Sequence, residues 1–376
     1  MHHTSAVAEI VSGIIILLLI AAATLALTKR LRLPYSVILV VVGIGLAFLA
    51  EQSAEAFPLL KQLAISPDLI LYVFLPTLIF ESSLNLDSRL LRQNIAPIAT
   101  LAIPGLLLST TLIGFIVHWA TPIPLLPALL LGAILSATDP VAVMALFKQL
   151  GAPQRLGVLV EGESLFNDAT SIVLSRILIG VLAAGTLDSS TLTNGLLDFI
   201  VLFFGGLLVG MLLGGLTATL LGLIESDSLL EITLTTVLAY ASFLVAEELL
   251  GVSGVMATVG AGITLGNWGR VKISPSVRIY LEHFWEQMAF IANALIFLML
   301  GLKVDLQALW HSLDLLPWVI IAMLLARGVI IYTLMPLVGR LPGSKPVGAA
   351  YQMVMFWGGL RGAIAIAIVL SLPHFE

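Results

Sequence analysis

Apolar runs of about 20 residues recur along almost the whole chain, and short segments rich in proline, glycine or charge separate them. A helix of this length crosses the hydrocarbon core of a bilayer, which is about 30 Å thick. Open sheet edges are excluded there because lipid cannot pair their backbone groups, and the runs lack the roughly ten-residue alternation of an outer-membrane barrel. Only 10% of the 376 residues are charged, against about 25% in a soluble domain. The sequence therefore predicts an all-α polytopic membrane protein.

The boundaries between the runs predict twelve membrane spans. No connecting loop is long enough to hold a soluble domain, and proline or glycine clusters mark most boundaries. The chain contains no cysteine, so disulfides and thiol chemistry are excluded, and its six scattered histidines do not form a Cys/His metal site. The predicted spans are 8–28, 35–50, 66–84, 95–118, 124–147, 156–182, 195–224, 229–249, 253–267, 279–302, 315–337 and 346–372.

Lysine and arginine are distributed unevenly between the two sides of the predicted membrane domain. If the N-terminus lies outside, 12 of them fall in inside loops, 2 in outside loops and 3 within spans. Because positively charged short loops stay in the cytoplasm, this bias predicts an external N-terminus. We expect a multi-pass protein of a prokaryotic inner membrane, with the lipid bilayer as its partner and no nucleic acid.

Two of the predicted spans are interrupted near their middle. The span 124–147 contains Ser136-Ala-Thr-Asp-Pro140, where the proline removes a hydrogen-bond donor and breaks the helix. The span 346–372 contains Gly358-Gly-Leu-Arg-Gly362, where glycines weaken the helix. These spans run in opposite directions, and opposed broken helices are typical of an inverted-repeat transporter with its site at the midplane. The spans between 95 and 182 would form one repeat, and those from 315 onward would begin the other.

A polar stripe lies inside the apolar span 156–182. Glu161, Ser164 and Asp168 share one helix face, and Glu163 and Asn167 share an adjacent face. Ionisable side chains are costly in the middle of a bilayer and usually mark a pathway or a paired site. The stripe therefore predicts a functional site in this helix.

Arginines within spans need compensating partners. Arg327 requires an anion, for which Glu163 and Asp168 are the candidates. Arg361 can compensate the carbonyl ends of the break at Gly358–Gly362, and Arg176 can snorkel toward the outer surface or serve a structural contact.

Several acidic side chains allow more than one role. Asp139 can bind a cation or compensate exposed N–H groups at the break. Glu81 can lie on the path by which ions reach the site, or it can be solvated at the membrane–water interface. Glu247 and Glu248 lie at a predicted span end and should be solvated. Glu161 has no assigned partner.

The segments SATDPVAV, GESLFNDATSIV, FWEQMAFIANALIFLMLG and GGLRGAIAIA, in this order, resemble the NhaP/NHE-type sodium/proton exchangers, the electroneutral branch of the monovalent cation–proton antiporters. The resemblance covers nearly all of the chain. It implies a thirteen-helix fold, of which this sequence holds twelve spans, and a homodimer. It also implies elevator-like movement of a core bundle, 91–184 with the incomplete repeat 305–376, against dimerisation helices at 1–90 and 185–304.

The resemblance also implies roles for individual residues. Thr138 and Asp139 match the motif of the unwound helix, and Asn167 and Asp168 match the motif whose aspartate binds cation and proton in turn. Ser164 and Glu81 match positions that help to coordinate the ion, so Na⁺ is expected at Asp168, Ser164 and Thr138. Glu163 and Arg327 match a buried ion pair. Asn167 in place of a second aspartate resembles the one-for-one exchangers.

The expected function is exchange of a monovalent cation, Na⁺ first, for H⁺, with both competing for Asp168. Burial favours the protonated form of a carboxylate and a bound cation favours the ionised form, which accounts for the competition. Alternatives are a K⁺/H⁺ or electrogenic antiporter of the same fold and an uncoupled channel. No enzyme activity and no cofactor beyond the transported ions are expected.

Overall fold

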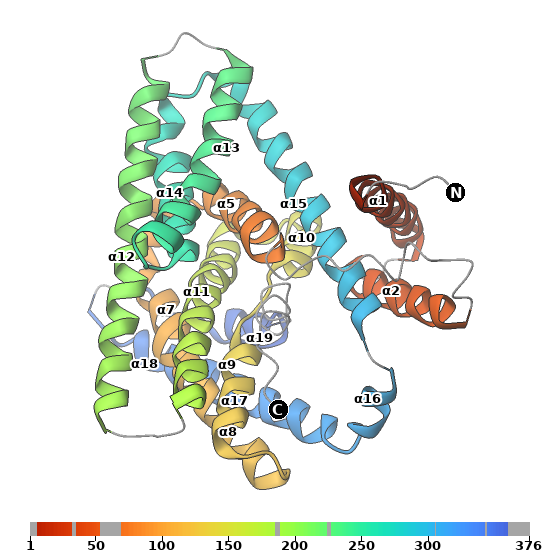
Figure 1. Cartoon of the computed structure of the whole chain (residues 1–376). Coiled ribbons are helices and arrows are strands. Elements are labelled where there is room, and N and C mark those ends of the chain that lie inside the picture. The colour runs from red at the N-terminus through yellow and green to blue at the C-terminus, as the bar shows by residue number, and fades with distance from the viewer. Residues whose placement is uncertain are drawn as a thin grey trace.

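The computed structural model describes residues 6–31, 35–52, 69–184, 189–223, 227–304, 306–342 and 344–359. These residues form helices joined by short connections, so the predicted all-α fold is confirmed (Figure 1). Among them, 7 helices are long and apolar enough to cross a membrane by length and composition. Shorter apolar helices lie at Tyr35–Leu49, Ile70–Asn85 and Leu125–Ser136.

The first half of the chain contains a series of helices whose order follows the predicted spans. They are α1 (Ala6–Leu31), α2 (Tyr35–Gln52), η1 (Ile70–Phe74), α5 (Leu75–Asn85), α6 (Ser88–Gln93), α7 (Ile95–Thr100), η2 (Leu101–Gly105), α8 (Leu106–Ala120), α9 (Leu125–Ser136), α10 (Val141–Leu150) and α11 (Gln154–Ala184). Here η1 and η2 are π-helical turns within longer helices.

The second half continues in the same way. Its helices are α12 (Ser189–Leu221), α13 (Ser228–Leu244), η3 (Val245–Leu249), α14 (Gly254–Asn267), η4 (Gly269–Val271), α15 (Pro275–Lys303), α16 (Leu306–His311), α17 (Leu316–Val329), η5 (Ile330–Leu334), α18 (Met335–Val338) and α19 (Ala349–Trp357). The predicted span 346–372 is helical in α19, and its residues from 360 onward, including Arg361, lie outside the described part of the chain.

Three of the π-helical turns lie at prolines. Pro104 is inside η2, and Pro76 and Pro336 follow η1 and η5 by two residues. Proline cannot donate the usual helical hydrogen bond and its ring collides with the preceding turn, so a widened turn accommodates it. The sequence predicted continuous helices at these places, and the π turns are an added feature of the structure.

The helices pack into two groups that meet along α11 (Figure 1). In the first, α7–α10 surround α11, and α17 packs on α8 with α18 on α7. We call this the core group, with α19 included because it packs on η5. In the second, α14 packs against α12, α13 and α5, and α15 packs against α1, α2 and α5. We call these helices the scaffold group.

Glycines bring the scaffold helices into direct backbone contact. A Cβ atom on Gly210 of α12 would lie 1.8 Å from the carbonyl oxygen of Ala257 in α14, and one on Gly266 would lie 2.0 Å from that of Leu84 in α5. Small residues are typical of closely packed membrane helices, because van der Waals contact drives their association in lipid. The helix α14 is thereby held between α12 and α5.

Replacing Gly210 by alanine should therefore destabilise the protein by about 1–3 kcal/mol, because the new methyl group forces α12 away from α14. The measurement is the midpoint of unfolding of purified protein in detergent. Gly215→Ala is the matched control on the same helix, since its Cβ would approach Trp268 only to 3.6 Å. Equal midpoints for the two variants would contradict the close packing of α12 on α14.

Candidate ion-binding site

The predicted break in the span 124–147 is present, with α9 ending at Ser136 and α10 beginning at Val141. Ala137 has extended backbone angles (φ −62°, ψ 141°), and Pro140 closes the segment at φ −88° and ψ −8°. Backbone groups of such a segment need partners from elsewhere, because no helical bond satisfies them and lipid offers none. The side chains of α11 supply those partners.

Thr138 is the point where α11 holds the broken helix. The Asn167 Nδ2 donates to Thr138 Oγ1 at 2.8 Å, and the backbone N–H of Thr138 donates to Asn167 Oδ1 at 3.4 Å. The Ser164 hydroxyl donates to the Thr138 carbonyl oxygen. All three residues are buried. The amide of Asn167 thus donates to one atom of Thr138 and accepts from another, whereas a carboxylate can only accept.

Asp168 lies one helical turn beyond Ser164, whose hydroxyl is 3.5 Å from Asp168 Oδ2. Asp139 is an electrostatic neighbour of Asp168, and its Oδ1 accepts from the Val141 backbone N–H at 2.9 Å. This second contact satisfies a free backbone N–H at the start of α10, which is the structural role that the sequence left open for Asp139. Carboxylate, hydroxyl and carbonyl oxygens are therefore gathered at the break, and hard cations favour such oxygen ligands.

Arg327 on α17 pairs with Glu163 on α11. Its Nη1 and Nη2 reach the two carboxylate oxygens of Glu163, and Nη2 also donates to the Met355 carbonyl at 2.7 Å. The side chains are 11% and 3% exposed, respectively. Of the two anions that the sequence offered to Arg327, the structure places Glu163 in contact with it.

The space around this ion pair is closely filled. A Cβ on Gly359 would lie 2.8 Å from Arg327 Nε, so the glycine leaves room for the guanidinium. The π turns η2 and η5 pack together on the other side, and a cavity of about 10 Å³ remains between the pair and Asn167. A cavity of this size holds about one water molecule. The ion pair is therefore enclosed within the core group.

Glu81 and Glu161 lie at the contact between α5 and α11. The Ser82 hydroxyl donates to Glu161 at 3.1 Å, which gives Glu161 the partner that the sequence did not reveal. Glu81 accepts from Asn85 Nδ2 at 3.0 Å on its own helix, and its electrostatic neighbours are Lys148, Glu161 and Glu286. The structure thus places Glu81 beside Glu161, outside the hydrogen-bond network of Thr138. Residue 361, also named from the sequence, is not among the described residues.

The sequence also missed a contact at the other end of α11. Arg176 forms an ion pair with Glu247 in η3, and the Glu247 side chain is only 11% exposed. Glu247 Oε2 also accepts from the Gly254 backbone N–H at 3.0 Å. The prediction that Glu247 is solvated was wrong, because α11 packs on α12 and α14 and brings Arg176 to η3. Only the position of Arg176 within a span hinted that it needed an anion.

The chain is similar in sequence to known proteins. The family model "Sodium/hydrogen exchanger, transmembrane" matches residues 14–376. The chain is 39% identical over 343 residues to the Na(+)/H(+) antiporter ApNhaP of Aphanothece halophytica, covering 91% of this chain and 63% of that protein. It is 38% identical over 363 residues to the low-affinity Na(+)/H(+) antiporter NhaS1 of Synechocystis, covering 94% and 66%. The chain thus spans a little under two thirds of the length of these two relatives.

Among solved structures, the sodium proton antiporter MjNhaP1 of Methanocaldococcus jannaschii has a similar fold. The TM-score is 0.75 at 21% sequence identity, over 96% of this chain and 85% of that one. At this identity the likeness concerns the fold. The family match, which extends over almost the whole sequence, and the close curated relatives identify the chain as a multi-pass membrane protein that belongs to the transmembrane sodium/hydrogen exchanger family.

Proposed function

We propose that this chain exchanges a monovalent cation, Na⁺ in the first place, for protons by alternating access. The observation that carries the proposal is the break between α9 and α10, where the Thr138 carbonyl, Ser164 and Asp168 bring oxygen atoms together. The names of ApNhaP and NhaS1 as Na(+)/H(+) antiporters support the choice of ions.

Asp168 is the residue for which cation and proton compete in this proposal. The cation loses most of its water at the site and takes oxygen ligands from Asp168, Ser164 and the Thr138 carbonyl. Asp139 or Glu81 would add a ligand directly or through water, and Asp139 is the nearer of the two to Asp168 in the structure. A bare carboxylate is costly within a membrane, so the core crosses only when Asp168 is neutralised by one ion or the other. This rule couples the two fluxes and prevents a leak.

Asn167 supports a one-for-one stoichiometry. It is neutral and its amide is engaged by Thr138, so it holds the break and adds no second charge to the site. If Asp168 carries one Na⁺ in one direction and one H⁺ in the other, each cycle moves no net charge. An electrogenic relative of the same fold would move net charge.

The decisive measurement is ²²Na⁺ uptake into proteoliposomes driven by an imposed pH gradient. We expect saturable uptake that a second pH gradient of opposite sign reverses. A membrane potential set by K⁺ and valinomycin, without a pH gradient, should not raise uptake above that of the same proteoliposomes at zero potential. Potential-driven uptake would replace the one-for-one assignment by an electrogenic one. Uptake that does not depend on the pH gradient would indicate a channel. Uptake of ⁸⁶Rb⁺, a tracer for K⁺, without uptake of ²²Na⁺ would indicate a K⁺/H⁺ exchanger.

We further propose that the two helix groups are the functional units of the exchanger. Residues 91–184 and 305–376 would move as the core against a scaffold formed by 1–90 and 185–304. The outward faces of α1 and α12 carry exposed apolar side chains such as Leu19 and Leu208, which lipid or a second copy of the chain would cover. We infer a homodimer in a prokaryotic inner membrane with its N-terminus outside, which cross-linking in membrane vesicles and N-terminal labelling test.

A further inference from the structure

The helix α11 makes polar contacts with the scaffold group on both sides of Asp168. Glu161 accepts from Ser82 toward one end, and Arg176 pairs with Glu247 toward the other. At a rise of about 1.5 Å per residue, these contacts lie about 10 Å and 12 Å from the level of Asp168. The residue proposed to carry the ion therefore lies between two points at which its helix is fastened to the scaffold.

The contact at Arg176 is firmly anchored on the scaffold side. Glu247 also accepts from Gly254 at the start of α14, and the neighbouring Glu248 accepts from the Tyr72 hydroxyl in η1. Donors from two scaffold segments, α14 and η1, thus hold these carboxylates. Arg176 is the only partner in this cluster that α11 contributes among the described residues, so the ion pair joins the two groups of helices.

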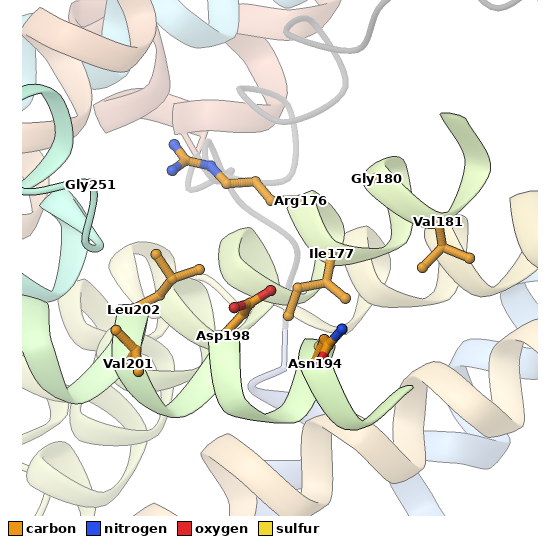
Figure 2. Close-up of a pocket in the computed structure, with 10 residues that line it drawn as sticks. Arg176, Ile177, Gly180, Val181, Asn194, Asp198, Val201, Leu202 and Gly251 are labelled. Atoms are coloured by element: carbon orange, nitrogen blue, oxygen red, sulfur yellow. The ribbon is translucent and has the colours of Figure 1, made fainter. Parts of the chain in front are cut away.

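A cavity of about 570 Å³ lies beside this ion pair, between α11 and α12. Figure 2 shows Ile177 and Val181 on α11 facing Asn194 and Asp198 on α12, with Arg176 at one side. A Cβ on the exposed Gly180 would meet no atom within 4 Å, whereas one on Gly195 of α12 would lie 3.1 Å from Ile177 Cγ2. The two helices therefore touch at Gly195 and Ile177 and leave open space beside Arg176 and Gly180.

The two ion pairs of α11 differ in how they could be broken. Glu163 and Arg327 lie inside the core group, with side chains 3% and 11% exposed, and separating them would strand buried charges. Arg176 is 40% exposed and borders the cavity, so its guanidinium can be rehydrated when it leaves Glu247. The ion pair of Glu163 and Arg327 therefore stays intact, whereas that of Arg176 and Glu247 can separate.

We propose that Arg176 and Glu247 form a latch that closes one side of the boundary between core and scaffold and opens in every transport cycle. The proposal rests on the exchange function proposed above. In this proposal, the attraction between the two charges favours the closed arrangement of core and scaffold. The exposure of Arg176 to solvent allows the ion pair to separate when the core moves. The pair acts on the conformational step and does not touch the transported ion.

The chain contains no cysteine, so engineered thiols can test the latch without background. In Arg176→Cys/Glu247→Cys, a bifunctional methanethiosulfonate reagent whose spacer spans the former contact should tie α11 to η3. Exchange in proteoliposomes should then fall by about tenfold or more, because the conformational step is blocked, and dithiothreitol should restore it. The matched control is Arg270→Cys/Glu282→Cys, which replaces an exposed ion pair within the scaffold. The same reagent should leave its exchange within about twofold.

A second variant keeps the ion pair intact. Ile177→Cys/Leu202→Cys places thiols on the two walls of the cavity, and cross-linking them should block exchange to the same extent. Undiminished exchange in either fully cross-linked variant would overturn the latch. The latch would also be overturned if Arg176→Cys/Glu247→Cys folded normally but showed no exchange before cross-linking, because a contact that opens in every cycle is not needed for ion binding. Absence of exchange by the unaltered chain would instead reject the proposed function.

Discussion

Replacing Asp168 by asparagine is expected to reduce pH-gradient-driven Na⁺ uptake by about a hundredfold or more, since the amide can neither take up a proton nor neutralise a cation. Asparagine has the same shape and can still accept from Ser164, whose hydroxyl lies 3.5 Å from Asp168 Oδ2. The fold should therefore be preserved. The measurement is ²²Na⁺ uptake by reconstituted protein, together with the midpoint of unfolding in detergent.

Asp314→Asn is the control for this experiment, because Asp314 is an exposed carboxylate in the turn between α16 and α17. Its uptake should equal that of the unaltered chain. Retained exchange in Asp168→Asn would remove Asp168 from its central role and leave Asp139 or Glu81 to carry the ion. A fall in both uptake and unfolding midpoint would assign Asp168 a structural role.

Breaking the ion pair between Glu163 and Arg327 is expected to give the largest loss of stability. Either Glu163→Gln or Arg327→Gln leaves one charge buried without its partner, which costs about 3–5 kcal/mol. The guanidinium binds both carboxylate oxygens and the Met355 carbonyl, so no nearby group can replace the missing partner without repacking α17 or α19. The measurement is the unfolding midpoint in a detergent titration.

Two comparisons test the physical reason. The double variant Glu163→Gln/Arg327→Gln should be more stable than either single variant, since neither buried charge remains. Arg270→Gln, which removes one side of an exposed ion pair with Glu282, should shift the unfolding free energy by no more than about 1 kcal/mol. If neither Glu163→Gln nor Arg327→Gln lowered the unfolding midpoint, water would have access to the ion pair in the membrane protein, and the assignment of a buried pair would be wrong.

The helix break at Pro140 and the helix spans could be predicted from the sequence because their causes are local. Pro140 cannot donate a helical hydrogen bond, and α9 ends four residues before it. The length of each apolar run follows from the thickness of the bilayer, and the predicted spans up to 315–337 match helices in the structure. The π turn at Leu101–Gly105 was missed, although Pro104 was visible, because the choice between a kink and a widened turn depends on the packing of η2 on η5.

Partners of buried charges depend on which helices meet, and that is decided by tertiary packing. Arg327 had two possible anions one to two turns apart on α11, and only the rotation of α17 against α11 selects Glu163. Glu161 and Glu247 are separated from Ser82 and Arg176 by 79 and 71 residues, so no spacing rule could join them. The structure likewise shows that Asp139 accepts from the first N–H of α10 while it neighbours Asp168.

By itself, the sequence determined that this chain is a bundle of membrane helices with a polar break at mid-depth, because hydrophobicity, helix period and proline geometry act within one segment. Family membership followed from motifs that are also local. The tertiary structure alone decided that Thr138 is bound by Asn167 and Ser164, and that one ion pair is enclosed while the other crosses between two groups of helices. Those contacts depend on the relative rotation and depth of helices distant in sequence, which side-chain volumes and glycine contacts across the interfaces set together.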